Sequence, residues 1–119
     1  MEKVIVIEFG MGIDQHGQDV TKAAVRAVED AIRHNSFPGL RSLVPGQDPN
    51  NMRVNVRLAV PIDKDKLDLD QVKAVFPYGE ITFEISDGGM LATSGIILED
   101  KGDKNDLAYV VIASIEVGY

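Results

Sequence analysis

Apolar and polar residues alternate along this 119-residue chain with two different periods. A period near 3.6 residues runs from Val20 to Ile32, so we expect an amphipathic helix there. Asp19 is the natural N-cap of this helix, and His34-Asn35 supplies a dipole partner and a stop. A second, shorter helix is expected between a cap at Asp68 and a stop at Pro77.

Alternation of period 2 predicts strands around these helices. The expected strands are Lys3–Phe9, Met52–Val60, Gly79–Asp87 and a final hairpin of Ile96–Glu99 with Leu107–Tyr119. Ser36–Asn51, with its Pro-Gly steps, is expected to be a long irregular loop. The order β-α-β-α-β-β favours one α+β domain over residues 1–119, with two helices on one face of a sheet. The first and last strands are apolar on both sides, which predicts a partner subunit as the second cover and hence a homo-oligomer.

Composition excludes several classes of function. The chain has 12 Lys+Arg against 19 Asp+Glu, a net charge of −7 and no cysteine. An acidic chain without a cluster of Lys and Arg residues is unsuited to bind nucleic acid or a membrane surface. Disulfides, thiolate nucleophiles and cysteine-based metal sites are excluded. The apolar runs are too short to cross a bilayer and the start does not resemble a signal peptide, so we expect a soluble cytoplasmic protein.

The stretch from Gly10 to Asp19 is expected to be a glycine-rich loop between the first strand and the first helix. Such a loop can bind phosphate, but the dinucleotide fingerprint needs a glycine at Gln15 and the Walker pattern is absent. Two interpretations stay open. The glycines form a tight turn with positive φ, or the loop binds a ligand through Gly10, Gly12, Gly17 and Asp19.

Asp14, His16 and Asp19 bring carboxylate and imidazole groups together in this loop. Such groups can bind a transition metal, or His16 can act as a base that Asp14 orients. In the structural alternative, Asp19 caps the helix, Asp14 serves the turn and His16 bonds to the backbone. A complete metal site needs three or four ligands, so we assign no metal here, and the sequence identifies no cofactor.

Arg53, Asn55 and Arg57 recur at every second residue of a predicted strand and therefore share one face. Two guanidinium groups on a sheet face can clamp a carboxylate or an imide oxygen. A solvated or ion-paired face that balances an acidic protein is the alternative. Ser86 precedes Asp87-Gly88-Gly89 and places a hydroxyl at a strand end beside glycines, a pattern that is typical of a plain turn.

The segment Phe9–Ala23, with its F-G-x-G-x-D-x-H-G-x-D-x-T-K-A pattern, and the segment Arg53–Pro61 resemble a short bacterial family of conserved hypothetical proteins. That resemblance covers nearly the whole chain and implies no activity. The order of elements is also similar to the Bacillus-type chorismate mutases, which implies a trimer with ligand sites between subunits.

A further resemblance is to one repeat of the ring-opening amidohydrolases, the cyanuric acid hydrolases and barbiturases. It implies a nucleophilic serine at Ser86, in an element that has one residue inserted here. Met11 stands where that family has its lysine, and without the lysine the serine lacks its base.

Two functions are therefore compared. The first is a homo-oligomer, with a trimer favoured, that binds a small anionic or imide-like metabolite between subunits and acts on it as a hydrolase or lyase. Arg53 and Arg57 would clamp the anion, and His16 or Asp14 would transfer protons. The second is a non-catalytic binding or assembly module whose glycine loop only packs.

Overall fold

A computed structural model describes all residues, 1–119, as an α+β fold with a mixed five-stranded sheet. The strands are β1 (Val4–Asp14), β2 (Arg53–Val60), β3 (Glu80–Asp87), β4 (Met90–Thr93) and β5 (Leu107–Gly118). The helices are α1 (Val20–Arg33), the single turn α2 (Leu40–Leu43) and α3 (Leu69–Lys73). Short 3₁₀ turns lie at Pro45–Gln47, Pro49–Asn51, Lys64–Lys66 and Glu99–Lys101.

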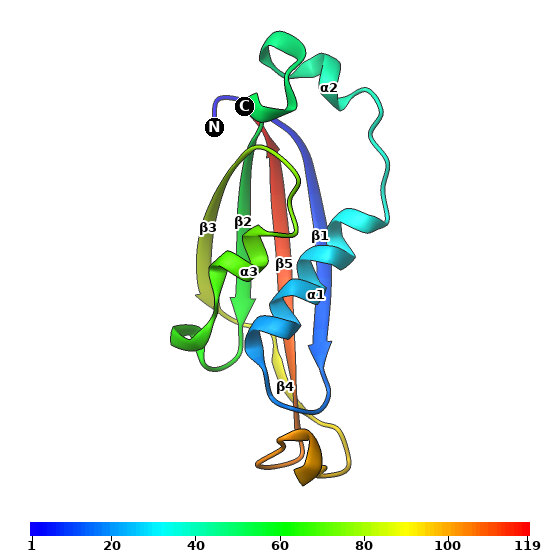
Figure 1. The fold of residues 1–119 in the computed structure, drawn as a ribbon, viewed down its shortest axis with the longest axis vertical. Coiled ribbons are helices and arrows are strands. Elements are labelled where there is room, and N and C mark those ends of the chain that lie inside the picture. The colour runs from blue at the N-terminus through cyan, green and yellow to red at the C-terminus, as the bar shows by residue number, and fades with distance from the viewer.

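The last strand, β5, lies in the centre of the sheet (Figure 1). The strand order is β1-β5-β2-β3, and β4 pairs with the first part of β5. β5 is antiparallel to β1, β2 and β4, whereas β2 and β3 are parallel. A crossover through α3 joins β2 to β3, as parallel neighbours require. β1 and β3 are consequently the two edges of the main sheet.

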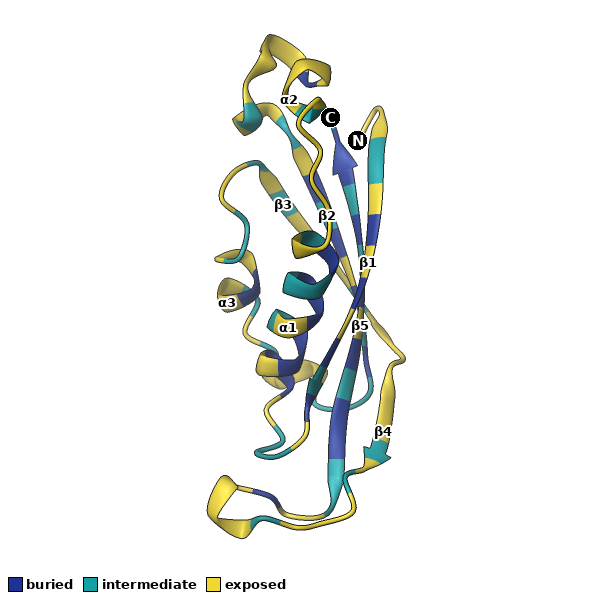
Figure 2. Ribbon diagram, turned by 90° about the vertical axis from the view of Figure 1, so that its right-hand side faces the viewer, coloured by how far each residue is buried: buried dark blue, intermediate teal, exposed yellow.

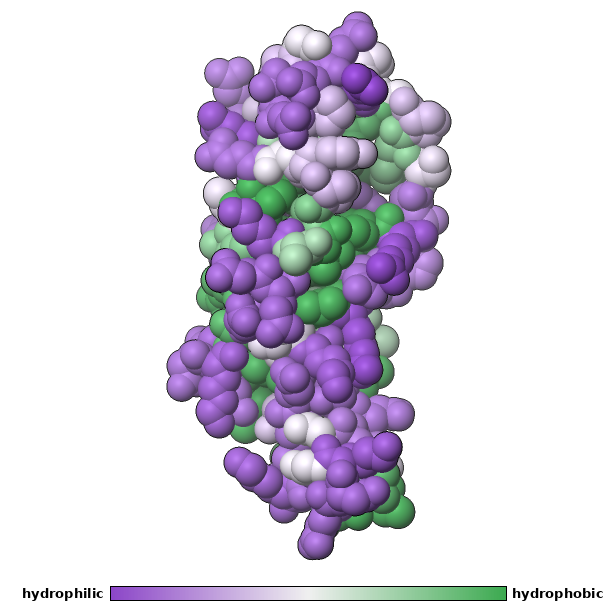
Figure 3. All heavy atoms as spheres, viewed as in Figure 1, coloured by the Kyte–Doolittle hydropathy of each residue, from purple (hydrophilic) through white to green (hydrophobic).

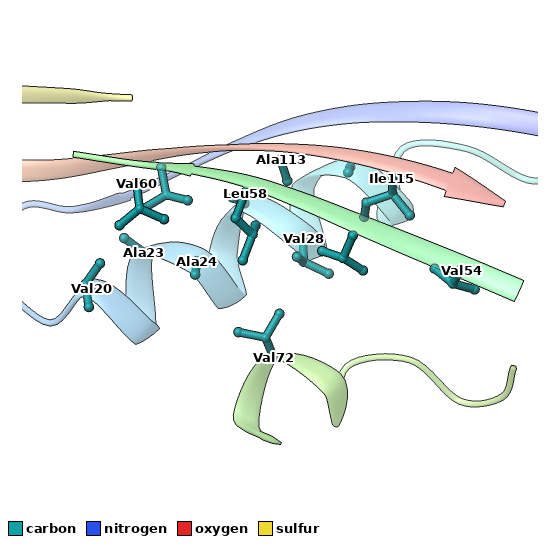
Figure 4. Close-up of a cluster of buried hydrophobic side chains, with 14 of the residues drawn as sticks. Val20, Ala23, Ala24, Val28, Val54, Leu58, Val60, Val72, Ala113 and Ile115 are labelled. Atoms are coloured by element: carbon teal, nitrogen blue, oxygen red, sulfur yellow. The ribbon is translucent and has the colours of Figure 1, made fainter. Parts of the chain in front are cut away.

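All helices lie on one side of the sheet, and its other face is uncovered (Figure 2). The core forms between this sheet and α1, with Val72 of α3 closing it from the side (Figure 4). Alternate residues of β2 and β5 supply most of the strand contribution, as the period-2 pattern predicts. The fully buried members are Val56, Leu58, Val60, Val111, Ala113 and Ile115.

The predicted first helix is confirmed by α1, together with its N-cap and its C-terminal end. Asp19 Oδ1 accepts hydrogen bonds from the backbone N–H groups of Thr21 and Lys22, and His34 is the C-cap. The buried stripe of α1 consists largely of alanines, at positions 23, 24, 27 and 31. Side chains this small let the helix backbone approach the sheet closely.

Gly10 and Gly12 allow the close approach of α1 to the sheet, and their position differs from the prediction. Both lie within β1, which continues to Asp14, so the connection to α1 is only Gln15–Asp19. A Cβ on Gly10 would lie 2.2 Å from the carbonyl oxygen of Ala27, and one on Gly12 would lie 2.0 Å from that of Ala23. The prediction of a loop from Gly10 was wrong because these two glycines allow the helix to contact the strand. Neither of them has the positive φ that a tight turn would need.

The predicted hairpin at the C-terminal end is also wrong in one strand. The strand that forms the hairpin with β5 is Met90–Thr93, whereas Ile96–Leu98 lies in the connection between the two strands. The segment Ser36–Asn51 is irregular, but it holds α2 and two 3₁₀ turns. No helix is long and apolar enough to cross a membrane.

Candidate functional site

The turn between β1 and α1 is organised by the buried carboxylate of Asp14. Asp14 Oδ2 accepts a hydrogen bond of 2.8 Å from the backbone N–H of Asp19. Its Oδ1 lies 3.5 Å from Nη1 of Arg26, which also donates to the carbonyl oxygen of Ile13 at 2.6 Å. Asp14 and Asp19 thus hold the turn and start the helix, as the structural interpretation of these residues predicts.

His16 faces a carboxylate that lies 87 residues further along the chain. Its Nδ1 lies 2.6 Å from Oδ2 of Asp103. Asp103 is almost completely buried, and its side chain also accepts hydrogen bonds from the backbone N–H groups of Gly17 and Leu98. These two backbone bonds, followed by the bond to His16, lower the pKa of Asp103 from 3.8 to about 2.

Gln18 extends this contact into a clasp between two loops. Its side chain donates to the side chain of Asn105 and to the carbonyl oxygen of Leu107, and it accepts from the backbone N–H of Lys104. Gln18 has a φ of 53°, a left-handed backbone that non-glycine residues seldom adopt. The bonds of Gln18 and Asp103 therefore fasten the loop before β5 onto the turn after β1. We call these contacts the Asp103 clasp.

The clasp leaves one part of the imidazole chemically available. Asp103 fixes Nδ1, and no protein group bonds to Nε2 of His16, whose side chain is 23% exposed. A carboxylate on Nδ1 fixes the tautomer and presents Nε2 as a proton acceptor or ligand atom. Sequence reasoning missed Asp103, because nothing in the polar turn Asp100–Asp106 distinguishes it from the other two aspartates there.

The predicted arginine pair lies on the uncovered face of the sheet. Arg53 pairs with Glu80 at 3.8 Å and Arg57 with Glu84 at 3.3 Å, each across the parallel β2–β3 ladder. Both guanidinium groups are more than half exposed. This arrangement is the ion-paired face of the alternative interpretation, and an external anion would have to compete with two carboxylates.

Asn55 lies between the two arginines and connects three strands. Its side-chain NH₂ donates to Glu84 on β3 and to Glu116 on β5, and its oxygen accepts from the hydroxyl of Thr82. A small cavity of about 190 Å³ lies here, lined mainly by polar residues that include Arg53 and Asn55 but not Arg57. The two arginines therefore do not share this cavity.

Ser86 does not lie with the other predicted catalytic residues. It is on β3, exposed on the uncovered face, and its neighbour on β2 is Ala59. Three strand spacings, about 14 Å in total, separate β3 from β1. The glycines after it are steric requirements, since a Cβ on Gly89 would lie 2.1 Å from the carbonyl oxygen of Val110. No three His, Asp or Glu side chains lie together in a way that could hold a metal ion.

The uncovered sheet face carries large apolar side chains as well as the polar ladder. They gather on β1, β4 and the adjoining part of β5, where cross-strand pairs such as Met11 with Ile112 place them side by side. We call this group the open-face patch. Its members and their exposed fractions are Ile7 (50%), Phe9 (71%), Met11 (51%), Met90 (59%) and Ile112 (39%).

Comparisons with known proteins give a family match and a closely similar solved structure. No curated protein matches the chain. A crystal structure described as that of an FtsZ-like protein of unknown function, from Nostoc punctiforme PCC 73102, is 42% identical in sequence with a TM-score of 0.86. The match covers 97% of this chain and 93% of that chain. Residues 4–117 match a family described as conserved hypothetical protein (Lin0512_fam). The chain therefore belongs to the conserved hypothetical Lin0512 family.

Proposed function

We propose that this protein is a homo-oligomeric assembly module whose subunits associate through the open-face patch. The observation that carries the proposal is the exposure of five large apolar side chains on one contiguous face. Side chains of this size bury on the order of 200 Å² each, so the patch exposes roughly 500 Å² of apolar surface. The largest patch on a typical monomer is about 300–600 Å², and patches in this range are often functional.

The polar half of the same face favours another copy of this chain as the partner. Arg53 and Arg57 stand beside Glu80, Glu84 and Glu116, so both signs of charge alternate next to the apolar half. A surface with both signs can complement a copy of itself, whereas a strongly charged partner would meet repulsion from part of the ladder. For the stoichiometry we propose a trimer, which is what the resemblance of the element order to the Bacillus-type chorismate mutases implies.

Replacement of Phe9 and Met11 by serine tests the assembly. Both side chains lie outside the core, so we expect the double variant to fold. Without the apolar contact between subunits, it should sediment as a monomer at micromolar concentrations. The wild type should sediment at three times that mass. Ile97→Ser is the matched control, because Ile97 is 50% exposed outside the patch and should leave the oligomer unchanged.

Two results would contradict the assembly. One is a wild-type protein that stays monomeric at concentrations of tens of micromolar. The other is an oligomer that survives the Phe9→Ser, Met11→Ser double substitution, because an interface elsewhere would then have to hold the subunits together.

A second candidate function rests on His16. An imidazole fixed by Asp103 through Nδ1, with Nε2 unbonded, suits proton transfer to a small anionic or imide-like metabolite. The described residues supply no nucleophile bonded to Nε2, so any reacting group would come from the ligand or a second subunit. His16→Gln keeps a polar side chain in the turn. Anionic or imide metabolites that raise the melting temperature of the wild type in a thermal-shift screen should not raise that of this variant. Equal shifts in the wild type and in His16→Gln would contradict a role of His16 in metabolite binding.

A further inference from the structure

Glu8 is a buried carboxylate on the helix side of β1, and no cationic side chain neutralises it. The residue is 9% exposed, and its neighbour on β5 is the buried Ile115. The only protein group that bonds to the carboxylate is the side-chain NH₂ of Asn35, which donates to Oε2 at 3.1 Å. The two basic residues at the end of α1, Arg33 and His34, pair with acidic residues of the helix itself. Burial of a charge without an opposite charge is unfavourable, so a cation beside Glu8 would be stabilising.

The C-terminal end of α1 adds negative potential at the same place. β1 passes directly beneath the last turn, because a Cβ on Gly10 would lie 2.4 Å from the backbone nitrogen of Ala31. Asn35 follows the C-cap His34, so its bond to Glu8 places the carboxylate beside the end of the helix. A helix carries about half a negative elementary charge at this end. A carboxylate and a helix terminus of the same sign therefore lie together.

The last carbonyl groups of α1 are free to bind a cation. Those of residues 30–33 accept no hydrogen bond from the protein, and helix carbonyls point towards the C-terminal end. Figure 3 shows hydrophilic side chains at the surface around this end of α1, at the right of the helix-side face. An ion can reach Glu8 from solvent, because its Oε1 has no protein partner and is not sealed from water.

We propose that Glu8 and the last turn of α1 bind a monovalent metal cation, sodium or potassium. Backbone carbonyl oxygens coordinate potassium in channel filters, and the C-terminal ends of helices coordinate sodium in transporters. One carboxylate and the partial charge of the helix end together match a single positive charge. The proposal is independent of the open-face patch, because Glu8 lies on the other face of the sheet.

Two observations favour a small monovalent ion over other cations. Glu8 belongs to no cluster of three His, Asp or Glu side chains, and a divalent ion usually needs more than one carboxylate. The two cavities beside this end of α1 are lined by other residues and not by Glu8. The carboxylate therefore has room for a single ion and its water, whereas an organic amine needs a cavity for its carbon atoms.

The first test compares the thermal stability of the full chain in KCl, NaCl and tetramethylammonium chloride at equal ionic strength. Tetramethylammonium has the same charge but is too large for several oxygen atoms to coordinate it closely. We expect the wild type to melt about 4 °C higher in about 100 mM KCl or NaCl, as for a ligand at several times its Kd. Glu8→Gln keeps the shape of the side chain and should melt at one temperature in all three salts. Glu80→Gln, at an exposed and ion-paired glutamate, is the matched control and should keep the wild-type difference.

Sodium NMR measures the binding directly. The wild type should broaden the sodium line, KCl should reverse the broadening, and tetramethylammonium chloride should not. Asn35→Asp places a second carboxylate beside Glu8, so we expect it to bind sodium at least threefold more tightly. Asn35 is exposed, so this variant decides the question even where Glu8→Gln does not fold.

Equal melting temperatures of the wild type in the three salts would overturn the proposal, because water would then satisfy Glu8 alone. A folded Glu8→Gln variant that keeps the wild-type difference would also overturn it, as would Asn35→Asp with unchanged sodium affinity. A larger stabilisation by CaCl₂ at the same concentration would assign the site to a divalent ion instead. The Phe9→Ser, Met11→Ser variant should keep the salt effect, and its loss there would place the cation at the subunit interface.

Discussion

At the scale of single residues, Gly10 has no room for a methyl group. A Cβ there would lie 2.2 Å from one backbone atom of α1 and 2.4 Å from another, and neither can rotate away. We expect Gly10→Ala to lower the free energy of unfolding by about 3 kcal/mol, at the upper end of the usual cost of overpacking. Urea denaturation measures this. Gly39→Ala is the matched control, since nothing lies within 4 Å of its added Cβ, and similar losses in both variants would argue against the close contact.

The acid limit of stability depends in part on Asp103. Its pKa is about 2 in the folded protein against an ordinary 3.8, so the folded state favours the ionised carboxylate. The resulting stabilisation is present above pH 4 and disappears as the pH falls from about 4 towards 2. Asp103→Asn should therefore flatten the pH dependence of stability in this interval. Thermal melts at pH 2 to 6 measure it, and parallel curves for wild type and variant would show that other carboxylates dominate.

The residues of the site show where sequence reasoning reaches its limit. The capping role of Asp19 was predictable because its partners are two and three residues away. The partner of His16 was not, because Asp103 comes into contact only when β5 pairs with β1. The glycine pair was misinterpreted for a related reason. A Gly-x-Gly pattern before a helix looks the same whether a ligand or the helix itself approaches the backbone.

At the scale of elements, the ends of α1 and α3 can be tested through their caps. Asp19→Ala removes acceptors of two backbone N–H groups, and we expect a loss of about 1 kcal/mol in the free energy of unfolding. Asp68→Ala should cost a similar amount at α3, where the cap also accepts two bonds. Lys22→Ala is the control, because its exposed side chain leaves the cap intact. Unchanged stability in Asp19→Ala would show that water replaces the cap without cost.

Elements with strong periodicity were predictable, whereas short ones were not. The alternation in β2 and the helical stripe of α1 each span at least eight residues and face a single core. β4 has only four residues, and Ile96–Leu98 is more apolar than its flanks, so local pattern favoured the wrong strand. Pairing with β5 selected Met90–Thr93 instead, because the Gly88-Gly89 turn directs the chain from β3 alongside β5.

At the scale of the whole molecule, the single chain is elongated. Its dimensions are 51 × 25 × 20 Å and its radius of gyration is 15.7 Å, against about 13–14 Å for a compact domain of this length. The Phe9→Ser, Met11→Ser double variant should give a radius of gyration close to that of the single chain in X-ray scattering, and the wild-type oligomer a larger one. Identical scattering from both proteins would contradict assembly through the open-face patch.

The central position of β5 has a consequence for how the protein is made. β5 is the last strand in the sequence, yet β1, β2 and β4 all bond to it. While the chain leaves the ribosome, β1 and β2 have no strand between them, and the sheet can close only after residues 107–118 have emerged. Contacts between such distant parts of a chain form slowly. Until these twelve residues emerge, β1 has no strand partner and its apolar side chains stay exposed, which is the condition in which chaperones bind nascent chains.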